Sequence, residues 1–143
     1  MSMLVASLIF VALLAVSFAH FLWSLGRTWP IRNEKLLAQT VVGLRDIEHM
    51  PPRIASLAVS MAMLAAGILA LALADKAAGG VWLTLAGLLP ASLFLARGIL
   101  GYTHWWAERT PEPNFRLNDA RVYSPLCIAL GLGFVALVAL RLI

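Results

Sequence analysis

The sequence predicts an all-α protein built as a bundle of four transmembrane helices. Of its 143 residues, 62% are hydrophobic and only 13% are charged, whereas a soluble domain has about 25% charged residues. The apolar residues also form four long stretches, and a membrane-spanning helix needs about 20 predominantly apolar residues. We therefore expect one integral membrane domain that covers residues 1–143.

Few ionisable side chains interrupt the four stretches. The first contains only His20, the second contains none, and the third carries Arg97 near its end. Arg141 lies near the far end of the fourth stretch, where a long side chain can extend to the headgroups. The predicted spans are residues 3–23, 54–74, 77–100 and 122–143.

Three sequence features predict how the spans pack and how they are linked. An alanine recurs every fourth residue in the second span, and such small-residue stripes allow close helix packing in lipid, so we expect a compact bundle. Between the first two spans, Asn33 is positioned to cap a short interfacial helix that Pro51 and Pro52 would end. The link 101–121 contains two prolines and is expected to be an ordered loop. The stripe consists of Ala58, Ala62, Ala66, Ala70 and Ala74.

The basic residues predict the orientation. Of the 11 lysines and arginines, all except Lys76 and Arg141 fall on the side of the two long links. By the positive-inside rule, these links face the cytoplasm and both termini face outward. The basic residues are spaced singly, not massed on one face, so we expect no nucleic-acid partner. Cys127 is the only cysteine, which excludes an intrachain disulfide.

Polar and ionisable side chains that could bind a ligand are concentrated on the side of the two long links. His20 and Arg97 stand out because they fall inside apolar spans, where ionisable residues are costly and usually face a bundle interior or a wet cavity. We expect Arg97 to point into the bundle and pair with Asp119, since Gly98 and Gly101 would let a neighbouring segment approach. The ligand-binding candidates are His20, Trp23, Arg97, Tyr102, His104, Asn118, Asp119 and Tyr123.

A metal or haem site on His20 and His104 is the sharpest alternative for these residues. No His-x-x-x-His or Glu-x-x-His spacing supports it, so we expect no metal site. A nucleophile formed by Ser124 or Cys127 with His20 lacks an elbow motif.

Several short motifs resemble a known family. The stretch from Arg97 to Cys127 carries the distinctive part, together with His20 and Trp23 in the first span. In these residues the chain resembles a family of small bacterial four-helix membrane proteins that is catalogued only as a domain of unknown function. The resemblance implies the four-helix architecture and implies no activity. The motifs are Arg97-Gly98, Gly101-Tyr102, Asn114-Phe115, Asn118-Asp119 and Tyr123-Ser124-Pro125-Leu126-Cys127.

We predict a polar and aromatic pocket at the cytoplasmic face that binds a lipid-like or anionic amphipathic ligand, or a partner membrane protein. Membrane lipid and a second copy of the chain are the other expected partners. The alternatives are an enzyme acting on a membrane-soluble substrate, with His20 or His104 as acid-base, and a small transporter subunit. An enzyme needs one of these histidines at an open cavity, whereas a scaffold would have a filled interior. The sequence leaves the cofactor and any catalytic residues open.

Overall fold

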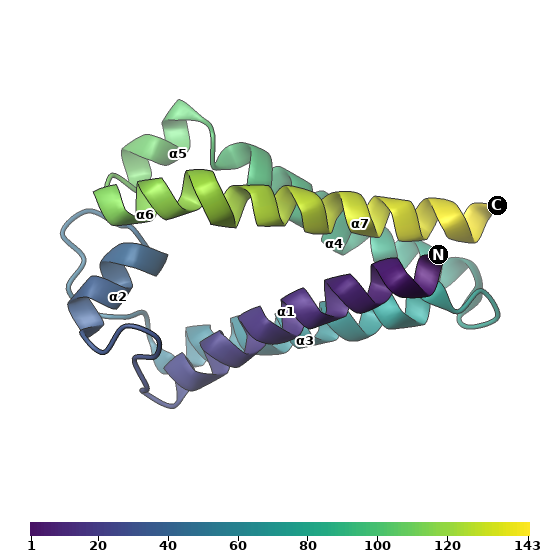
Figure 1. The fold of residues 1–143 in the computed structure, drawn as a ribbon, viewed down its shortest axis with the longest axis horizontal. Helices are drawn as coiled ribbons and strands as arrows, with labels where there is room; N and C mark the ends of the chain where they lie inside the picture. Colours follow the sequence, from purple (N-terminus) through teal and green to yellow (C-terminus); the bar gives the residue numbers. More distant parts are fainter.

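The computed structural model describes residues 1–143 and is all-helical, as predicted (Figure 1). Four of its helical segments are long and apolar enough to cross a membrane, namely α1, α3, α4 and the continuous stretch from α6 to α7. The elements are α1 (Ser2–Ser24), α2 (Glu34–Val41), α3 (Arg53–Ala74), α4 (Gly80–Leu100), α5 (His104–Arg109), α6 (Pro113–Asn118), the π-helical turn η1 (Asp119–Tyr123) and α7 (Ser124–Leu142).

The long helices associate as two pairs, α1 with α3 and α4 with α7 (Figure 1). Small residues line both contacts. In the first pair, the hydroxyls of Ser17 and Ser60 each donate to the backbone carbonyl of the other residue at 2.8 Å. In the second pair, a Cβ added at Gly131 would lie 2.9 Å from the backbone nitrogen of Leu95. Close backbone approach therefore holds each pair together.

The two pairs meet at one end of the molecule and separate toward the other (Figure 1). They meet at the end that carries both termini and the α3–α4 turn, which we call the closed end. There, side chains from all four long helices form one buried cluster. We call the other end, where α2, α5 and α6 lie, the α2 end. The cluster consists of Ala6, Ile9, Leu13, Ala70, Leu73, Ala74, Ala91, Leu130, Phe134 and Leu137.

The alanine stripe of α3 follows this division and does not pack along its whole length. Ala70 and Ala74 are buried in the cluster at the closed end. Ala62 and Ala66 line a cavity at the α2 end, and Ala66 also packs against the edge of the cluster. The expected compact bundle is therefore present in only half of the molecule, because the two pairs diverge where the stripe continues.

The short helix between the first two spans is present but differs from the expected form. The Asn33 side chain accepts a hydrogen bond from the Leu36 amide at 3.0 Å, which confirms the cap. The helix ends at Val41, well before the two prolines, because Gly43 and Asp46 adopt left-handed backbone conformations. The helix contacts α6 and buries Leu37 and Ala38, so α2 is docked on the bundle.

The link 101–121 is mostly helical, which corrects the prediction of a loop. Thr103 caps α5 by accepting from the Trp106 amide at 3.3 Å. Pro113 opens α6, where its missing N–H costs no helical hydrogen bond. Helix α6 then continues through η1 into α7, so the fourth membrane helix begins at Pro113 and not near residue 122. The third span begins at Gly80, since Gly79 and Gly80 both have positive φ.

Arg141 folds back onto the α3–α4 turn. Its Nη1 donates to the carbonyls of Leu73 and Asp75 at 3.1 and 2.5 Å. Its Nη2 donates to the carbonyl of Ala78 at 2.6 Å, and its Nε donates to the Thr84 hydroxyl at 3.1 Å. The guanidinium thus caps the end of α3, where helical carbonyls lack partners.

Candidate functional site

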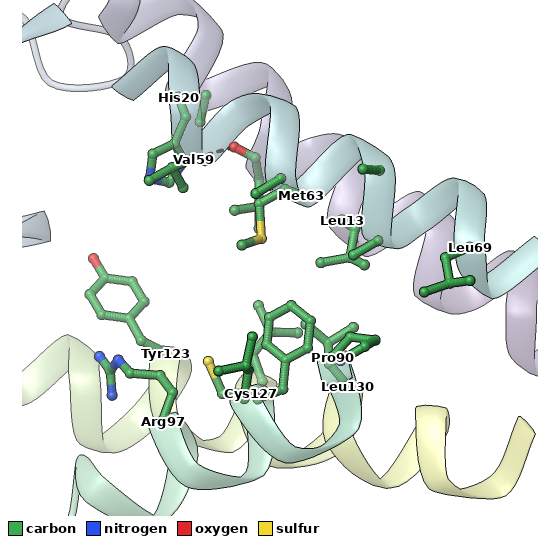
Figure 2. A pocket seen from close by; sticks show the side chains of 18 of the residues that line it. Leu13, His20, Val59, Met63, Leu69, Pro90, Arg97, Tyr123, Cys127 and Leu130 are labelled. Carbon is green, nitrogen blue, oxygen red and sulfur yellow. Dashed lines mark hydrogen bonds between the residues drawn. The ribbon is translucent and has the colours of Figure 1, made fainter. Parts of the chain in front are cut away.

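A cavity of about 810 Å³ lies between the two helix pairs at the α2 end (Figure 2). Of its 21 lining residues, 18 are hydrophobic. Met63 from α3 and Leu130 from α7 point into it from opposite sides. This volume falls within the usual range for small-molecule sites, about 300–1,000 Å³, and a mostly apolar lining is typical of such sites.

Polar groups reach the cavity at one end only, where His20, Arg97 and Tyr123 lie (Figure 2). The Nδ1 atom of His20 is 2.9 Å from the carbonyl oxygen of Val16. Because a carbonyl can only accept, Nδ1 carries the proton and donates. In the neutral ring, Nε2 then holds a lone pair, and it has no hydrogen-bond partner in the protein. The ring packs on Trp23 with 4.6 Å between centroids.

Arg97 is held by a carboxylate, a hydroxyl and an aromatic ring. Its Nη2 donates to Asp119 Oδ1 at 2.7 Å, and its Nη1 donates to Ser124 Oγ at 3.4 Å. The guanidinium carbon lies 4.8 Å from the centre of the Trp106 ring, in a cation–π contact. The predicted pair with Asp119 is confirmed. The Arg97 side chain remains 30% exposed and lines the cavity, so some of its donors stay available.

Asp119 is fully buried, and its carboxylate accepts hydrogen bonds from several donors. Oδ1 also accepts from the Ser124 hydroxyl at 3.0 Å, and Oδ2 accepts from Trp106 Nε1 at 2.9 Å. A second guanidinium, that of Arg116, lies 3.7 Å from Oδ2. One buried carboxylate is therefore shared by two arginines, and this charge cluster has a net charge of +1.

Two glycines and a π-helical turn bring these groups together. A Cβ at Gly101 would overlap the Ser124 hydroxyl, and a Cβ at Gly98 would lie 2.9 Å from the Ser124 carbonyl. The missing side chains therefore let α7 approach α4 beside Arg97, as expected. In η1, the Ser124 amide donates to the carbonyl of Asp119, five residues earlier. Such π turns occur frequently at functional sites.

Tyr123 connects the cavity to α2. Its hydroxyl donates to the carbonyl oxygen of Thr40 at 3.2 Å, and Val41, the next residue, lines the cavity. The Tyr123 ring lies 5.9 Å from that of Phe115 between centroids. A Cβ at Gly43 would overlap the Phe115 ring, so the end of α2 is fitted closely over α6. Helix α2 thus closes this end of the cavity.

The candidates predicted from sequence separate into two groups. His20, Trp23, Arg97 and Tyr123 line the cavity, and Asp119 lies behind Arg97. The other three are elsewhere: Tyr102 donates to the Ala120 carbonyl at 3.0 Å, Asn118 donates to Asn114 at 2.8 Å, and His104 is exposed at the start of α5. The structure therefore does not bring His20 and His104 together at the cavity.

Sequence reasoning missed three side chains that complete the polar end and one on the apolar wall of the cavity. Trp106 is not among the sequence candidates, and Arg116 enters the sequence argument only through its charge, yet both contact Asp119. Ser124 was considered only as a nucleophile, and it bridges Arg97 and Asp119. Met63 carries no sequence signal that separates it from other apolar residues. No group of three or more His, Cys, Asp or Glu side chains is placed to hold a metal ion.

Comparisons with known proteins agree with the resemblance noted in the sequence. No curated protein and no solved structure matches the chain. A family described as "Protein of unknown function (DUF3995)" matches residues 13–134. That range includes every residue that lines the cavity and both partners of the Arg97–Asp119 pair. The chain therefore belongs to the DUF3995 family.

Proposed function

We propose that this protein binds an amphipathic, lipid-like ligand with an anionic headgroup in the cavity at the α2 end. The observation that carries the proposal is the polarity of the cavity: an apolar chamber with polar groups at one end only. An amphiphile has the same asymmetry. Its chain would bury against side chains such as Met63 and Leu130, and its headgroup would meet Arg97.

Charge supports an anionic headgroup. The cluster of Arg97, Arg116 and Asp119 carries two positive charges and one negative charge. Arg97 uses Nη1 for Ser124 and Nη2 for Asp119, and a guanidinium has further N–H donors that suit carboxylate or phosphate oxygens. His20 Nε2 and the Tyr123 hydroxyl add polar positions at the same end. A zwitterionic or neutral headgroup would leave the net charge uncompensated.

An open interior argues against a purely structural scaffold, which would fill this space. A partner membrane protein remains the competing occupant of the same face, but an apolar partner helix would not supply acceptors for Arg97. An enzyme acting on a membrane-soluble substrate is the second candidate. It is favoured by His20, whose unpartnered Nε2 belongs to a ring that lines the cavity and could accept a proton from a bound substrate.

We further propose a bacterial inner-membrane location with the α2 end at the cytoplasmic face and both termini outside. The excess of basic residues on the long links supports this orientation. Alkaline phosphatase fused after Ile143 should be active, and the same reporter after Thr110 should be inactive. Reversed activities would place the charge cluster at the outer face.

The binding proposal is tested by analysing what co-purifies with the protein. The chain is extracted from membranes in mild detergent, and bound amphiphiles are identified by mass spectrometry. We expect a stoichiometric anionic amphiphile with wild type and with Arg109→Gln, since Arg109 stacks on Trp105 away from the cavity. Met63→Trp, which places a large indole ring in the cavity and leaves the ion pair intact, should retain much less of it.

Two outcomes would overturn the binding proposal. Equal retention in wild type and Met63→Trp would show that the amphiphile sits outside the cavity. Co-purification of a protein partner in place of an amphiphile, to the same extent with wild type and Met63→Trp, would favour a structural scaffold. Turnover of the retained compound that His20→Gln abolishes would establish the enzyme.

A further inference from the structure

The cavity reaches only halfway through the helices. On α1 its lining runs from Leu13 to Trp23, and on α3 it runs from Val59 to Leu69. Ten residues of α-helix rise about 15 Å, which is half of the hydrocarbon thickness of about 30 Å. Beyond this depth the buried cluster of the closed end fills the space between the pairs. The cavity therefore has the length of one leaflet.

One wall of the cavity is open to the surroundings of the bundle. Leu89 and Leu93 on α4 line the cavity and are 64% and 60% exposed. On α3, Ala62 and Ala65 also line it and are exposed. On the opposite side, the lining residues of α1 and α7 are half-buried or buried. The opening thus lies between α3 and α4, at the depth of the hydrocarbon chains.

The polar end is covered by contrast. Helix α2 is tied there through the Tyr123–Thr40 hydrogen bond and the contact of Gly43 with Phe115. A smaller cavity of about 120 Å³ continues from the main one beneath the chain that follows α2, and it shares His20 and Trp23 with it. A ligand with a long apolar chain has a wider path from the lipid than from water.

From these three features we infer that the cavity is a one-leaflet lipid site entered sideways. A lipid of the leaflet at the α2 end slides one acyl chain between α3 and α4, and its anionic headgroup stays at the level of Arg97. This inference rests on the proposed function and adds the source of the ligand, the bilayer itself, and its route. The net positive charge of the cluster formed by Arg97, Arg116 and Asp119 complements the anionic headgroup of such a lipid.

The route is tested with a photoreactive lipid in the full-length protein. The protein is placed in nanodiscs of phosphatidylcholine with a minor fraction of phosphatidylglycerol that carries a diazirine midway along one chain. After illumination, adducts are mapped by mass spectrometry. We expect adducts on interior side chains, Met63 and Leu130, as well as on outward-facing ones such as Ile68.

Two variants make the test specific. Ala62→Trp places a large ring in the opening, and interior adducts should fall severalfold while the adduct at Ile68 is unchanged. Ala58→Trp, one turn earlier on α3, is exposed but does not line the cavity, and it should behave as wild type. Both variants are compared at equal thermal stability, so that loss of fold is separated from loss of entry.

The outcomes separate this inference from the proposed function. Adducts on outward-facing residues alone, with none inside, would mean ordinary surrounding lipid and would overturn the sideways site. Interior adducts that Ala62→Trp does not reduce would overturn the α3–α4 route but keep the binding site. If an amphiphile still co-purifies and depends on Met63, the proposed function survives either result.

Discussion

The two intramembrane arginines, Arg97 and Arg141, lie at opposite ends of the bundle and have different partners. At the closed end, Arg141 donates to several backbone carbonyls around the α3–α4 turn and to the Thr84 hydroxyl. At the α2 end, Arg97 has one buried carboxylate and one hydroxyl as hydrogen-bond partners. Both guanidiniums are hydrogen-bonded within the protein, but only Arg97 faces a cavity.

The surroundings of the two arginines explain the difference. At the closed end, side chains from all four long helices are packed together, and Arg141 completes a turn that nothing else needs to enter. At the α2 end, the helix pairs separate, and a charged network with α2 above it takes the place of a packed core. One end of the bundle is built for stability, and the other end provides space and unused donors.

The largest expected effect is removal of the carboxylate that compensates Arg97. Asp119→Ala leaves the Arg97 guanidinium without its buried partner, and breaking such a pair costs about 3–5 kcal/mol. Asp75→Ala is the matched control, since Asp75 is exposed at the closed end and interacts with Arg141 through its backbone carbonyl. Unfolding in detergent should separate the two variants clearly, and equal losses would mean that the network at Arg97 contributes nothing to stability.

A second prediction compares the two halves of the alanine stripe one helical turn apart. Ala70 is fully buried in the cluster, so Ala70→Phe should destabilise by overpacking, about 1–3 kcal/mol. Ala66 lines the cavity, where a phenyl ring has room, so Ala66→Phe should cost less than about 1 kcal/mol. Thermal unfolding of both variants checks this. A larger loss for Ala66→Phe would show that the cavity is filled by protein.

The smallest effect is expected at an ion pair outside the bundle. Lys35 donates to Glu48 at 3.0 Å with both side chains largely exposed. This hydrogen bond and the lysine charge lower the pKa of the Glu48 carboxyl. Any contribution to stability is therefore present above the ordinary glutamate pKa and lost as pH falls through the lowered value. Because solvent screens the pair, Lys35→Ala should raise the Glu48 pKa toward its ordinary value, as measured by NMR, without moving the unfolding midpoint.

The long helices and the Arg97–Asp119 pair could be predicted from sequence because both follow from solvation. Apolar stretches of membrane length give the spans, and an arginine inside one of them demands a nearby anion. The helices of the link 101–121 were missed because Pro113 was assigned to a turn, whereas it begins α6. The residue types that line the cavity could be predicted in part, but its shape and position could not. Both depend on how far the two helix pairs diverge, and alanine spacing does not encode that divergence.

Trp106 shows a second limit of sequence reasoning. Its indole hydrogen bond to Asp119 and its contact with Arg97 depend on α5 folding back over the start of α6. A tryptophan near a membrane boundary is ordinarily explained by the headgroup region. Only the arrangement of the link distinguishes this buried role from the general preference.

The binding of an anionic amphiphile in the cavity is tested most directly by methionine-methyl NMR in phosphatidylcholine nanodiscs. Met63 points into the cavity (Figure 2), whereas Met61, two residues earlier on α3, is 58% exposed and does not line it. Titration with phosphatidylglycerol should shift the Met63 signal saturably, leave Met61 unchanged, and lose its effect in Ala66→Phe. Equal shifts at both methionines, or a Met63 signal that does not respond, would contradict a ligand site in the cavity.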